Sequence, residues 1–444
     1  MADQRDSNAE KKSPAPEGSL CGTSVTIDDV RHVLGRHFGL DSAPELADWS
    51  AVEIGAGKGF MSVLARVKLN WKDAAVAGKL PASVIAKVPT MTKIRVLTEH
   101  NPELEKMVDM MKKEISMVHN TEVSMYELFK KHAFSPTPIP TIFGQQRLAD
   151  ENSLDNNDKA YLIMSDLTET AGIVDFLKCR KLNDRQVKQL ITSLARLHAW
   201  SLVVDTSSVL TFDGVIEKML DHIVKQHEFI AEEFEKDDEW KEALGESLIK
   251  KCGMFKMDPD GFVETLKNGH KQFGLPDVLM HGDIHLNNML FKLDDHGKPT
   301  GDFVALIDWQ VVQRGNGLVD IARALNMPLD YASRTEQYRN EMLDLYYDEF
   351  EKMLAEKRAN QKAEKTEPPT SIMPFDRATL RAAFWRFYVF FQRIWVPGMV
   401  NMVKSVKAGL VPDTDAKVDS RSLIEDAKMQ FEELVQLMEK VSVE

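Results

Sequence analysis

The stretch VLMHGDIHLNNMLF, from Val278 to Phe291, places two histidines, one aspartate and two asparagines between two apolar runs. The apolar runs predict short strands, so the polar residues fall in one tight turn. Asp283 can accept the proton of an attacking hydroxyl, and Asn288, five residues later, can hold Mg²⁺ through its carbonyl oxygen. The turn therefore favours phosphoryl transfer. A polar turn held by its own Asx hydrogen bonds is the alternative.

Zinc is a second alternative for this turn. His281 and His285 have the spacing of two ligands on a zinc-binding helix. However, Gly282 lies between them, no glutamate follows His281, and the flanking runs are typical of strands. The pattern therefore disfavours zinc.

A second acidic residue follows the turn. Asp308 ends the apolar run VALIDWQ, twenty residues after Asn288, and the turn signal DDHGKPTGD between them predicts a hairpin. The hairpin would return Asp308 to the cavity that Asp283 and Asn288 face, where it would be a further magnesium ligand. Asp320, in GNGLVDIARAL, either braces this loop or is a carboxylate favoured at a helix start by the helix dipole.

A glycine-rich turn lies near the start of the chain. Gly55, Gly57 and Gly59 occur in EIGAGKGFMSVLARV, where backbone amides can approach phosphate oxygens. No Gly-Lys-Ser/Thr follows, and the next residues alternate like a strand instead of opening a helix, so neither a Walker loop nor a dinucleotide fingerprint is indicated. The turn either folds over a nucleotide or is an ordinary hairpin.

Lys87 stands in the strand-like run SVIAKVP. It either points to solvent from an edge strand or supplies a cation for nucleotide phosphates. The second role needs a carboxylate partner, for which Glu122 is the candidate and Glu114 the rival. A single glutamate on a helix is usually only solvated, so the partner stays open.

The bulk properties exclude several classes of protein. A chain of 444 residues exceeds one ordinary core, so two domains are expected. A net charge of -13 argues against nucleic-acid partners and anionic membranes. Cys21, Cys179 and Cys252 have no CxxC spacing, which with the lack of an apolar leader predicts a cytoplasmic protein.

One apolar segment resembles a membrane span. RAAFWRFYVFFQRIWVPGMV, residues 381–400, is interrupted by Arg386, Gln392 and Arg393. A spanning helix bears a high free-energy cost for such residues, so we expect a buried helix and no membrane insertion.

The order of patterns predicts an α+β protein. We expect a disordered tail over residues 1–20, a small sheet-containing lobe over 21–166 and a mainly helical lobe over 167–444, with an exposed linker or insertion at 355–371. In the first lobe, Thr26 caps a short helix. In the second, Asn183 or Asp184 caps the helix in NDRQVKQLITSLARLHAWS.

HGDIHLNNMLF with LIDWQ resembles the catalytic signature of the choline kinase and aminoglycoside phosphotransferase superfamily. Within it, the sequence is most similar to the ecdysteroid kinase-like (CHK kinase-like) family, as are LARLHAWS and the spacing of Glu122 and Tyr126. The resemblance spans residues 53–325. It implies a two-lobed protein-kinase-like fold, ATP with Mg²⁺, and phosphorylation of a small-molecule hydroxyl.

The resemblance also implies roles for single residues. Asp283 becomes the catalytic base, Asn288 and Asp308 the magnesium ligands, and Lys87 the phosphate lysine with Glu122 as its ion-pair partner. The segment from Met164 to Asp166 becomes the hinge against the adenine. Two departures are Ser165, where the family often has glutamate, and Trp309-Gln310 in place of the Phe-Gly of protein kinases.

The acceptor is the open part of this expectation. An aromatic cluster on one predicted helix either fills the core or lines a pocket for a lipophilic molecule, such as a steroid or xenobiotic, or for a choline-like cation. The cluster comprises Phe384, Trp385, Phe387, Tyr388, Phe390, Phe391 and Trp395. We expect most rings in the core and a lipophilic acceptor. A catalytically silent nucleotide-binding homologue is the other candidate, and the sequence does not indicate an oligomeric state.

Overall fold

The structure is a computed structural model. It describes residues 16–55, 61–92, 94, 108–154, 158–174, 181–209, 232, 234–252, 259–326, 329, 333–361, 373–407 and 420–441. The chain forms two compact units: the first contains 1–116 and 141–166, and the second contains 117–140 and 167–444. One division between the units falls after Asp166, and 117–140 groups with the second unit.

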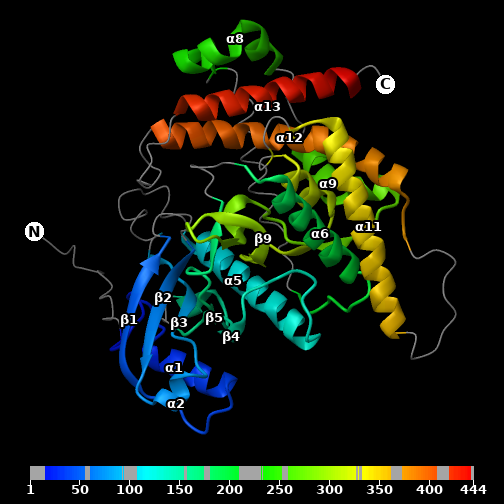
Figure 1. Ribbon diagram of the computed structural model, residues 1–444. Helices are drawn as coiled ribbons and strands as arrows, with labels where there is room; N and C mark the ends of the chain where they lie inside the picture. The colour runs from blue at the N-terminus through cyan, green and yellow to red at the C-terminus, as the bar shows by residue number, and fades with distance from the viewer. Residues whose placement is uncertain are drawn as a thin grey trace, which may run out of the picture. The chain divides into compact units, whose positions relative to one another are not determined.

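Unit 1 contains one antiparallel sheet with the strand order β1-β2-β3-β5-β4 (Figure 1). The strands are β1 Leu46–Ile54, β2 Ser62–Trp71, β3 Ser83–Pro89, β4 Ile142–Gln146 and β5 Tyr161–Ser165. In β2, every second residue from Val63 to Trp71 is buried, as the alternating sequence predicts. The sheet has two edges, β1 and β4, and β3 lies inside it.

Helix α1, Ile27–His37, packs on the core of this sheet. Thr26 caps it as predicted, in a capping box with Asp29. A short helix, α2, spans Ala74–Ala77, and a 3-10 turn, η1, spans Glu151–Leu154.

The predicted disordered tail is too long. Leu20 is fully buried in the core that includes α1, and its backbone N–H donates to the Val25 carbonyl at 2.8 Å. The ordered chain therefore includes residues 16–20, because an apolar side chain near the tail reaches the core. Residues 1–15 lie outside the described part.

Helices dominate unit 2. They are α6 Asp184–Trp200, α8 Asp238–Cys252, α9 Pro259–Asn268, α10 Leu318–Ala324, α11 Glu336–Gln361, α12 Arg377–Lys407 and α13 Ser420–Val441. Helix α5, Val108–Lys131, begins in unit 1 and continues into unit 2 from Met117. Asn183 caps α6. Within unit 2, α6 lies beside α11, and α13 lies between α8 and α12 (Figure 1).

Short strands interrupt these helices. They are β6 Ala171–Ile173, β7 Val278–Met280, β8 Met289–Leu293, β9 Pro299–Leu306 and β10 Gln313–Gly315, with 3-10 turns η3 Gly269–Phe273 and η4 Leu286–Asn288. Strands β8 and β9 form the predicted hairpin, which β6 joins, and β7 pairs with β10. The α+β class is confirmed: a small antiparallel sheet near the N-terminus precedes a mostly helical remainder.

The predicted linker at 355–371 requires correction. Helix α11 continues to Gln361, so the first seven residues of that stretch are helical. Their sequence, AEKRANQ, is polar and low in apolar residues, but Ala, Glu, Lys, Arg and Gln also have high helix propensity. Residues 362–372 lie outside the described part.

Helix α12 contains the apolar segment 381–400 and is packed inside unit 2. Phe384, Phe387, Tyr388 and Phe391 are each less than 5% exposed, which confirms the core position expected for most rings. The side chain of Trp395 is outside the description. None of the helices in the described ranges combines the length and apolarity needed to cross a membrane.

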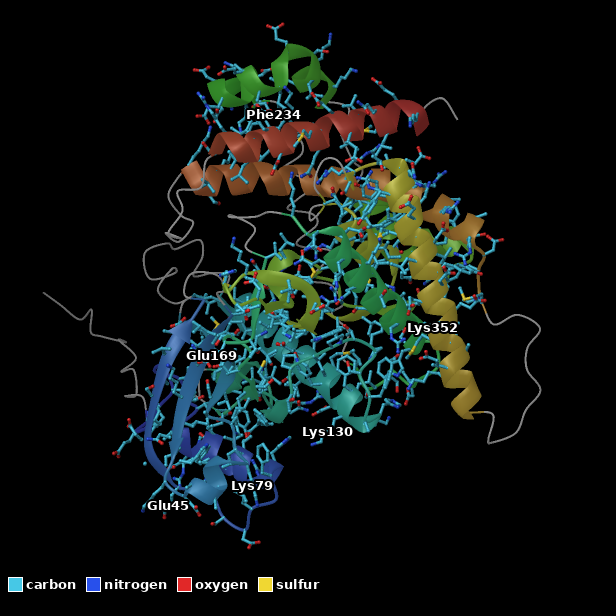
Figure 2. The ribbon with its side chains drawn as sticks, viewed as in Figure 1. Glu45, Lys79, Lys130, Glu169, Phe234 and Lys352 are labelled. Atoms are coloured by element: carbon cyan, nitrogen blue, oxygen red, sulfur yellow. The ribbon has the colours of Figure 1, made fainter. Side chains whose placement is uncertain are left out.

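The core beside α12 is continuous with α8 and α13. Phe234, labelled in Figure 2, contacts Trp240 of α8 and Phe431 of α13, with ring centroids 4.9 and 5.2 Å apart. Burial of these rings stabilises the helical layer.

Candidate functional site

The turn after β7 depends on a glycine. Gly282 has a φ of +83°, and a Cβ there would lie 2.6 Å from the Val311 carbonyl oxygen. A side chain is excluded by both the left-handed conformation and the close backbone. The chain can therefore reverse sharply between His281 and Asp283.

Asp320 of α10 holds this turn. Its carboxylate is fully buried and accepts the backbone N–H groups of His281 at 2.7 Å and Gly282 at 2.9 Å. His198 Nε2 lies 3.3 Å from the same carboxylate, and Tyr346 is 2.8 Å from the other ring nitrogen. Asp320 therefore braces the loop, and it also lies in the first turn of α10, where the helix dipole favours a carboxylate.

The environment keeps Asp320 ionised. Burial alone would raise the pKa of its carboxyl group, but the hydrogen bond and charge of His198 lower the pKa below its ordinary value. The charged Asp320 carboxylate therefore accepts hydrogen bonds from two backbone N–H groups of the turn and fixes them in place.

The two histidines of the turn are already hydrogen-bonded. His281 Nδ1 accepts the Asp283 N–H at 3.2 Å, so Nε2 donates to the Ile307 carbonyl at 3.0 Å. His285 Nδ1 accepts the Asn287 N–H, and its Nε2 lies 3.2 Å from Asp283 Oδ2. All four ring nitrogens are engaged in contacts within the site and are not directed at a common metal position, which argues against the zinc alternative.

Arg323 contacts the predicted catalytic carboxylate. From α10, its Nη1 donates to Asp283 Oδ1 at 2.7 Å and to the Gly282 carbonyl at 2.8 Å. Asp283 therefore has Arg323 on one oxygen and His285 on the other. Burial would raise the pKa of Asp283, but the hydrogen bond from His285 and the charge of Arg323 hold it well below its usual range.

Sequence reasoning did not identify Arg323 or the contact made by His285. The signal for Arg323 was its place three residues after Asp320, on the same face of the helix in VDIARAL. A helix arginine is usually solvated, so this spacing alone did not predict its role.

Asn288 joins the turn to the end of β9. Its Nδ2 donates to the Asp283 carbonyl at 3.0 Å, and its own carbonyl accepts the Ile307 N–H at 3.0 Å. The side chain is 4% exposed. Because the amide nitrogen makes the loop bond, the side-chain oxygen is the atom that can bind a cation.

Asp308 has a left-handed backbone, with a φ of +68°. This conformation is uncommon for residues other than glycine and is most accessible to Asn and Asp. The next residue holds it: Trp309 is fully buried, donates Nε1–H to the Leu306 carbonyl at 3.2 Å and lies 4.7 Å from the His281 ring. Backbone strain of this kind occurs at functional sites.

Glu122 and Asp308 both act electrostatically on Tyr126. Both carboxylates raise the pKa of Tyr126, although burial of that phenol is the larger cause. Glu122 itself is 1% exposed. The second part of α5 also contacts this turn, because the rings of Phe129 and Trp309 lie 5.3 Å apart.

The Tyr126 hydroxyl is buried and has no hydrogen-bond partner in the described part of the chain. A hydrated cation bound by Asp308 would bring water to this hydroxyl and positive charge to Asp308 and Glu122. Asp308 and Asn288 offer the hard oxygen ligands that Mg²⁺ prefers. These residues therefore fit a magnesium ion.

The described ranges contain no group of three or more His, Cys, Asp or Glu side chains arranged around a metal position. Mg²⁺ does not require one, because it usually binds one or two carboxylates and takes its other ligands from water and substrate phosphates. The ligand set therefore favours magnesium with a phosphorylated substrate over a zinc site.

The remaining predicted residues lie in unit 1. Lys87 is half-buried in β3, opposite Leu64 of β2 and Leu162 of β5, so it does not stand on an edge strand. Gly55 has a φ of +65° at the turn after β1. Gly57 and Gly59 lie outside the described residues.

The predicted hinge forms the end of β5. Met164 is 8% exposed and pairs with Ile85 of β3. The Asp166 carboxylate accepts Arg66 Nε–H at 2.7 Å and the Ser83 hydroxyl. The side chain of Asp166 therefore ties β5 to its neighbours. A hinge role through the backbone stays a prediction, as does the pairing of Lys87 with Glu122 or Glu114.

A small cavity in unit 2 is not the site. Its volume is about 20 Å³, and its walls include Val278, Leu318 and Tyr346 but none of the predicted catalytic or magnesium-binding residues. This space suits about one water molecule.

Comparison with known proteins gives three findings. The DUF1679 family model, described as "Uncharacterized oxidoreductase dhs-27", matches residues 15–440. The Caenorhabditis elegans protein of that name is 23% identical over 334 residues, 74% of this chain and 36% of its own length. The "Uncharacterized kinase-like protein D1044.1" of C. elegans is 24% identical over 288 residues, 64% of this chain and 70% of its own.

Among solved structures, the choline kinase of Cryptosporidium parvum Iowa II is similar to this chain. The TM-score is 0.43 at 12% identity, covering 88% of this chain and 90% of that one. A likeness at this level carries no weight for substrate or activity.

Proposed function

The chain belongs to the DUF1679 family, and we propose that it is an ATP- and magnesium-dependent kinase that phosphorylates a hydroxyl of a small molecule. One observation carries the proposal: Asp283 and Asn288 share one braced turn, and Asp308 follows the hydrogen-bonded end of the adjoining hairpin. The kinase-like name of one relative and the expected protein-kinase-like fold support it.

In the proposed reaction, the acceptor oxygen bonds to the γ-phosphorus of ATP and the bond from that phosphorus to ADP breaks. The hydroxyl proton leaves towards Asp283. Because its pKa is held low, Asp283 is a weak base, and its contribution is mainly to orient the hydroxyl. Arg323 and His285 fix the carboxylate for that task.

Asn288 and Asp308 would hold Mg²⁺, which neutralises charge on the phosphates. Lys87 would bind phosphate oxygens, and Gly55, Gly57 and Gly59 would cover the nucleotide. The backbone from Met164 to Asp166 would contact the adenine. Membership of the ecdysteroid kinase-like family and a lipophilic acceptor, such as a steroid or xenobiotic, belong to the same proposal.

The oxidoreductase name belongs to a relative of which only 36% is aligned. In this chain, the described residues that follow the glycine-rich stretch form antiparallel strand β2, from Ser62. A dinucleotide-binding turn opens a helix whose N-terminus receives the pyrophosphate. The glycine turn therefore does not favour a nicotinamide cofactor.

Replacing Lys87 with alanine tests the nucleotide site. We expect the ATP concentration for half-maximal ADP release to rise about tenfold, because one charge-assisted phosphate contact is lost. The measurement is ADP release from Mg·ATP over an ATP titration. Lys68→Ala is the control, since Lys68 is exposed on neighbouring strand β2. If Lys87→Ala and Lys68→Ala require the same ATP concentration for half-maximal ADP release, Lys87 does not bind the phosphates as proposed.

A further inference from the structure

Arg323 holds the catalytic turn with only part of its guanidinium group. Its Nη1 donates both to Asp283 Oδ1 at 2.7 Å and to the Gly282 carbonyl at 2.8 Å. An arginine that serves as the ion-pair partner of a carboxylate frequently uses two nitrogens, in two parallel hydrogen bonds. Here a single nitrogen makes both contacts, so the other two nitrogens do not take part in holding the turn.

The Nε and Nη2 groups of Arg323 have no hydrogen-bond partner among the described residues, and both atoms reach solvent. The Arg323 side chain is 22% exposed, and that of Asp283 is 26% exposed. The edge that these two nitrogens form is therefore open beside the carboxylate that we propose as the base. A planar edge with two N–H donors matches the oxygens of a phosphoryl group.

The guanidinium group is also fixed in place. Asp320, on the same helix, is fully buried and accepts the backbone N–H groups of His281 and Gly282. Helix α10 therefore grips the turn through an acceptor, Asp320, and a donor, Arg323. A cation held in this way does not have to reorganise during a reaction, and electrostatic stabilisation of a transition state is then most effective.

The reacting phosphorus must come close to this edge. In the proposed kinase, the acceptor hydroxyl donates a hydrogen bond of about 2.7 Å to Asp283 and approaches the γ-phosphorus to about 3.5 Å before the new bond forms. The phosphorus therefore lies within about 6 Å of an Asp283 oxygen. Arg323 donates to the same carboxylate at 2.7 Å, so the phosphoryl oxygens come within one side-chain length of its open edge.

Charge develops in the reaction where Arg323 can act on it. As the hydroxyl proton moves to Asp283, that carboxylate becomes neutral and its pairing with the guanidinium group weakens. Negative charge is meanwhile spread over the three oxygens of the transferring phosphoryl group. The positive charge that offsets Asp283 before the reaction can then offset the phosphoryl group.

We infer that Arg323 is a second catalytic residue: its Nη1 stays on the turn, while its Nε and Nη2 donate hydrogen bonds to the phosphoryl group in transfer. The inference rests on the proposed kinase function and adds a residue of unit 2 that stabilises the transition state. A carboxylate on the acceptor is the other oxygen anion that this edge could bind, and the test separates the two.

Arg323→Gln removes the charge and the planar edge but keeps an amide NH₂ group that can donate to the Gly282 carbonyl. We expect the kcat for ADP release from Mg·ATP, with water or a lipophilic alcohol as acceptor, to fall about a hundredfold, because a donor to the transition state is lost. The ATP concentration for half-maximal release should change by less than about threefold, since the contact is made mainly in the transition state. Arg185→Gln, at an exposed ion pair with Asp302, is the matched control and should behave as wild type.

A second measurement separates a direct contact from a role through Asp283. Aluminium fluoride with Mg·ADP mimics the phosphoryl group in transfer, so its binding can be measured without turnover. We expect it to strengthen ADP binding to wild type and to Asp283→Asn, and to do so about a hundredfold less when Arg323→Gln is added to either protein. If Arg323 only positions Asp283, Arg323→Gln should have no further effect in Asp283→Asn.

The outcomes separate this inference from the kinase proposal. Unchanged kcat in Arg323→Gln, or no loss of aluminium-fluoride-dependent ADP binding in the double variant, would overturn the inference. So would normal turnover with water and a specific loss of turnover with hydroxy acids, which would assign the edge to an acceptor carboxylate. If Mg·ATP does not bind to wild type at all, the kinase proposal itself fails.

A second variant covers the case in which Arg323→Gln shows no cooperative melting transition. Arg323→Lys keeps the positive charge beside Asp283 and lacks the planar edge. We expect the same two losses at about tenfold, because a point charge replaces part of the contact to the phosphoryl oxygens. Wild-type values of kcat and of aluminium-fluoride-dependent ADP binding in Arg323→Lys would contradict the role of the edge.

Discussion

Replacing Asp283 with asparagine will lower phosphoryl transfer about a thousandfold and leave Mg·ATP binding intact. The substitution keeps the shape of the side chain but removes the negative charge that accepts the hydroxyl proton. It also weakens the contact with Arg323, now 2.7 Å, which fixes the orientation of the group. Because Asp283 is a proposed base and not a magnesium ligand, nucleotide affinity should not change.

The rate is measured as ADP formation from Mg·ATP, with a lipophilic alcohol or with water as acceptor. The control is Asp295→Asn, at an exposed position of the β8–β9 turn, which should behave as wild type. If Asp283→Asn forms ADP at the wild-type rate, Asp283 is not the base of the reaction.

Asp320→Asn will lower the free energy of unfolding by about 3 kcal/mol, because it disrupts a buried charged acceptor. The carboxylate is fully buried and accepts two backbone N–H groups of the catalytic turn. In asparagine an NH₂ group replaces one carboxylate oxygen. This NH₂ group would face a backbone N–H of the turn or the His198 ring, and it cannot accept a hydrogen bond from either. Activity should fall with stability, since the turn that presents Asp283 loses its brace.

Urea unfolding measures this change, and Asp295→Asn is again the control, with an expected change within about 0.5 kcal/mol. The pKa of Asp320 is lowered in the folded protein, so its charge stabilises the fold above the ordinary carboxyl pKa, and this contribution is lost as the pH falls through the lowered value. Wild type should therefore lose more stability than Asp320→Asn on acidification below about pH 4. Equal stability of the two proteins at neutral pH would contradict the bracing role.

Elements with strong local signals could be predicted from the sequence. The alternation in β2, the Thr26 cap of α1 and the Asn183 cap of α6 depend on neighbouring residues, and the structure contains all three. The grouping of Asp283 with Asn288 could also be predicted, because Asn288 is the fifth residue after Asp283 in one turn. Asp308 follows the second strand of a hairpin whose turn signal is explicit.

Contacts between distant segments could not be predicted in this way. Arg323 meets Asp283 across 40 residues, and His198 meets Asp320 across 122 residues. Nothing in the local composition distinguishes such residues from solvated ones. They acquire their roles when helices pack and leave specific polar groups inside.

Two boundary errors have a similar cause. Leu20 was assigned to a disordered tail because its neighbours are polar, yet one apolar side chain reaches the core of unit 1. The end of α11 was assigned to a linker or insertion because the stretch is charged and low in apolar residues, although most of its residues favour a helix. Composition indicates how much a segment can bury, and it does not decide whether the segment continues a helix.

The most direct test of the proposed kinase is the melting temperature with ATP, with and without magnesium, for wild type and Asp308→Asn. Asparagine also adopts the left-handed backbone required at this position, so the variant removes the charge and keeps the turn. We predict a magnesium-dependent rise of about 3 °C or more for wild type and its loss in the variant. No rise at millimolar Mg·ATP would contradict the nucleotide site and favour a catalytically silent homologue that acts through protein partners.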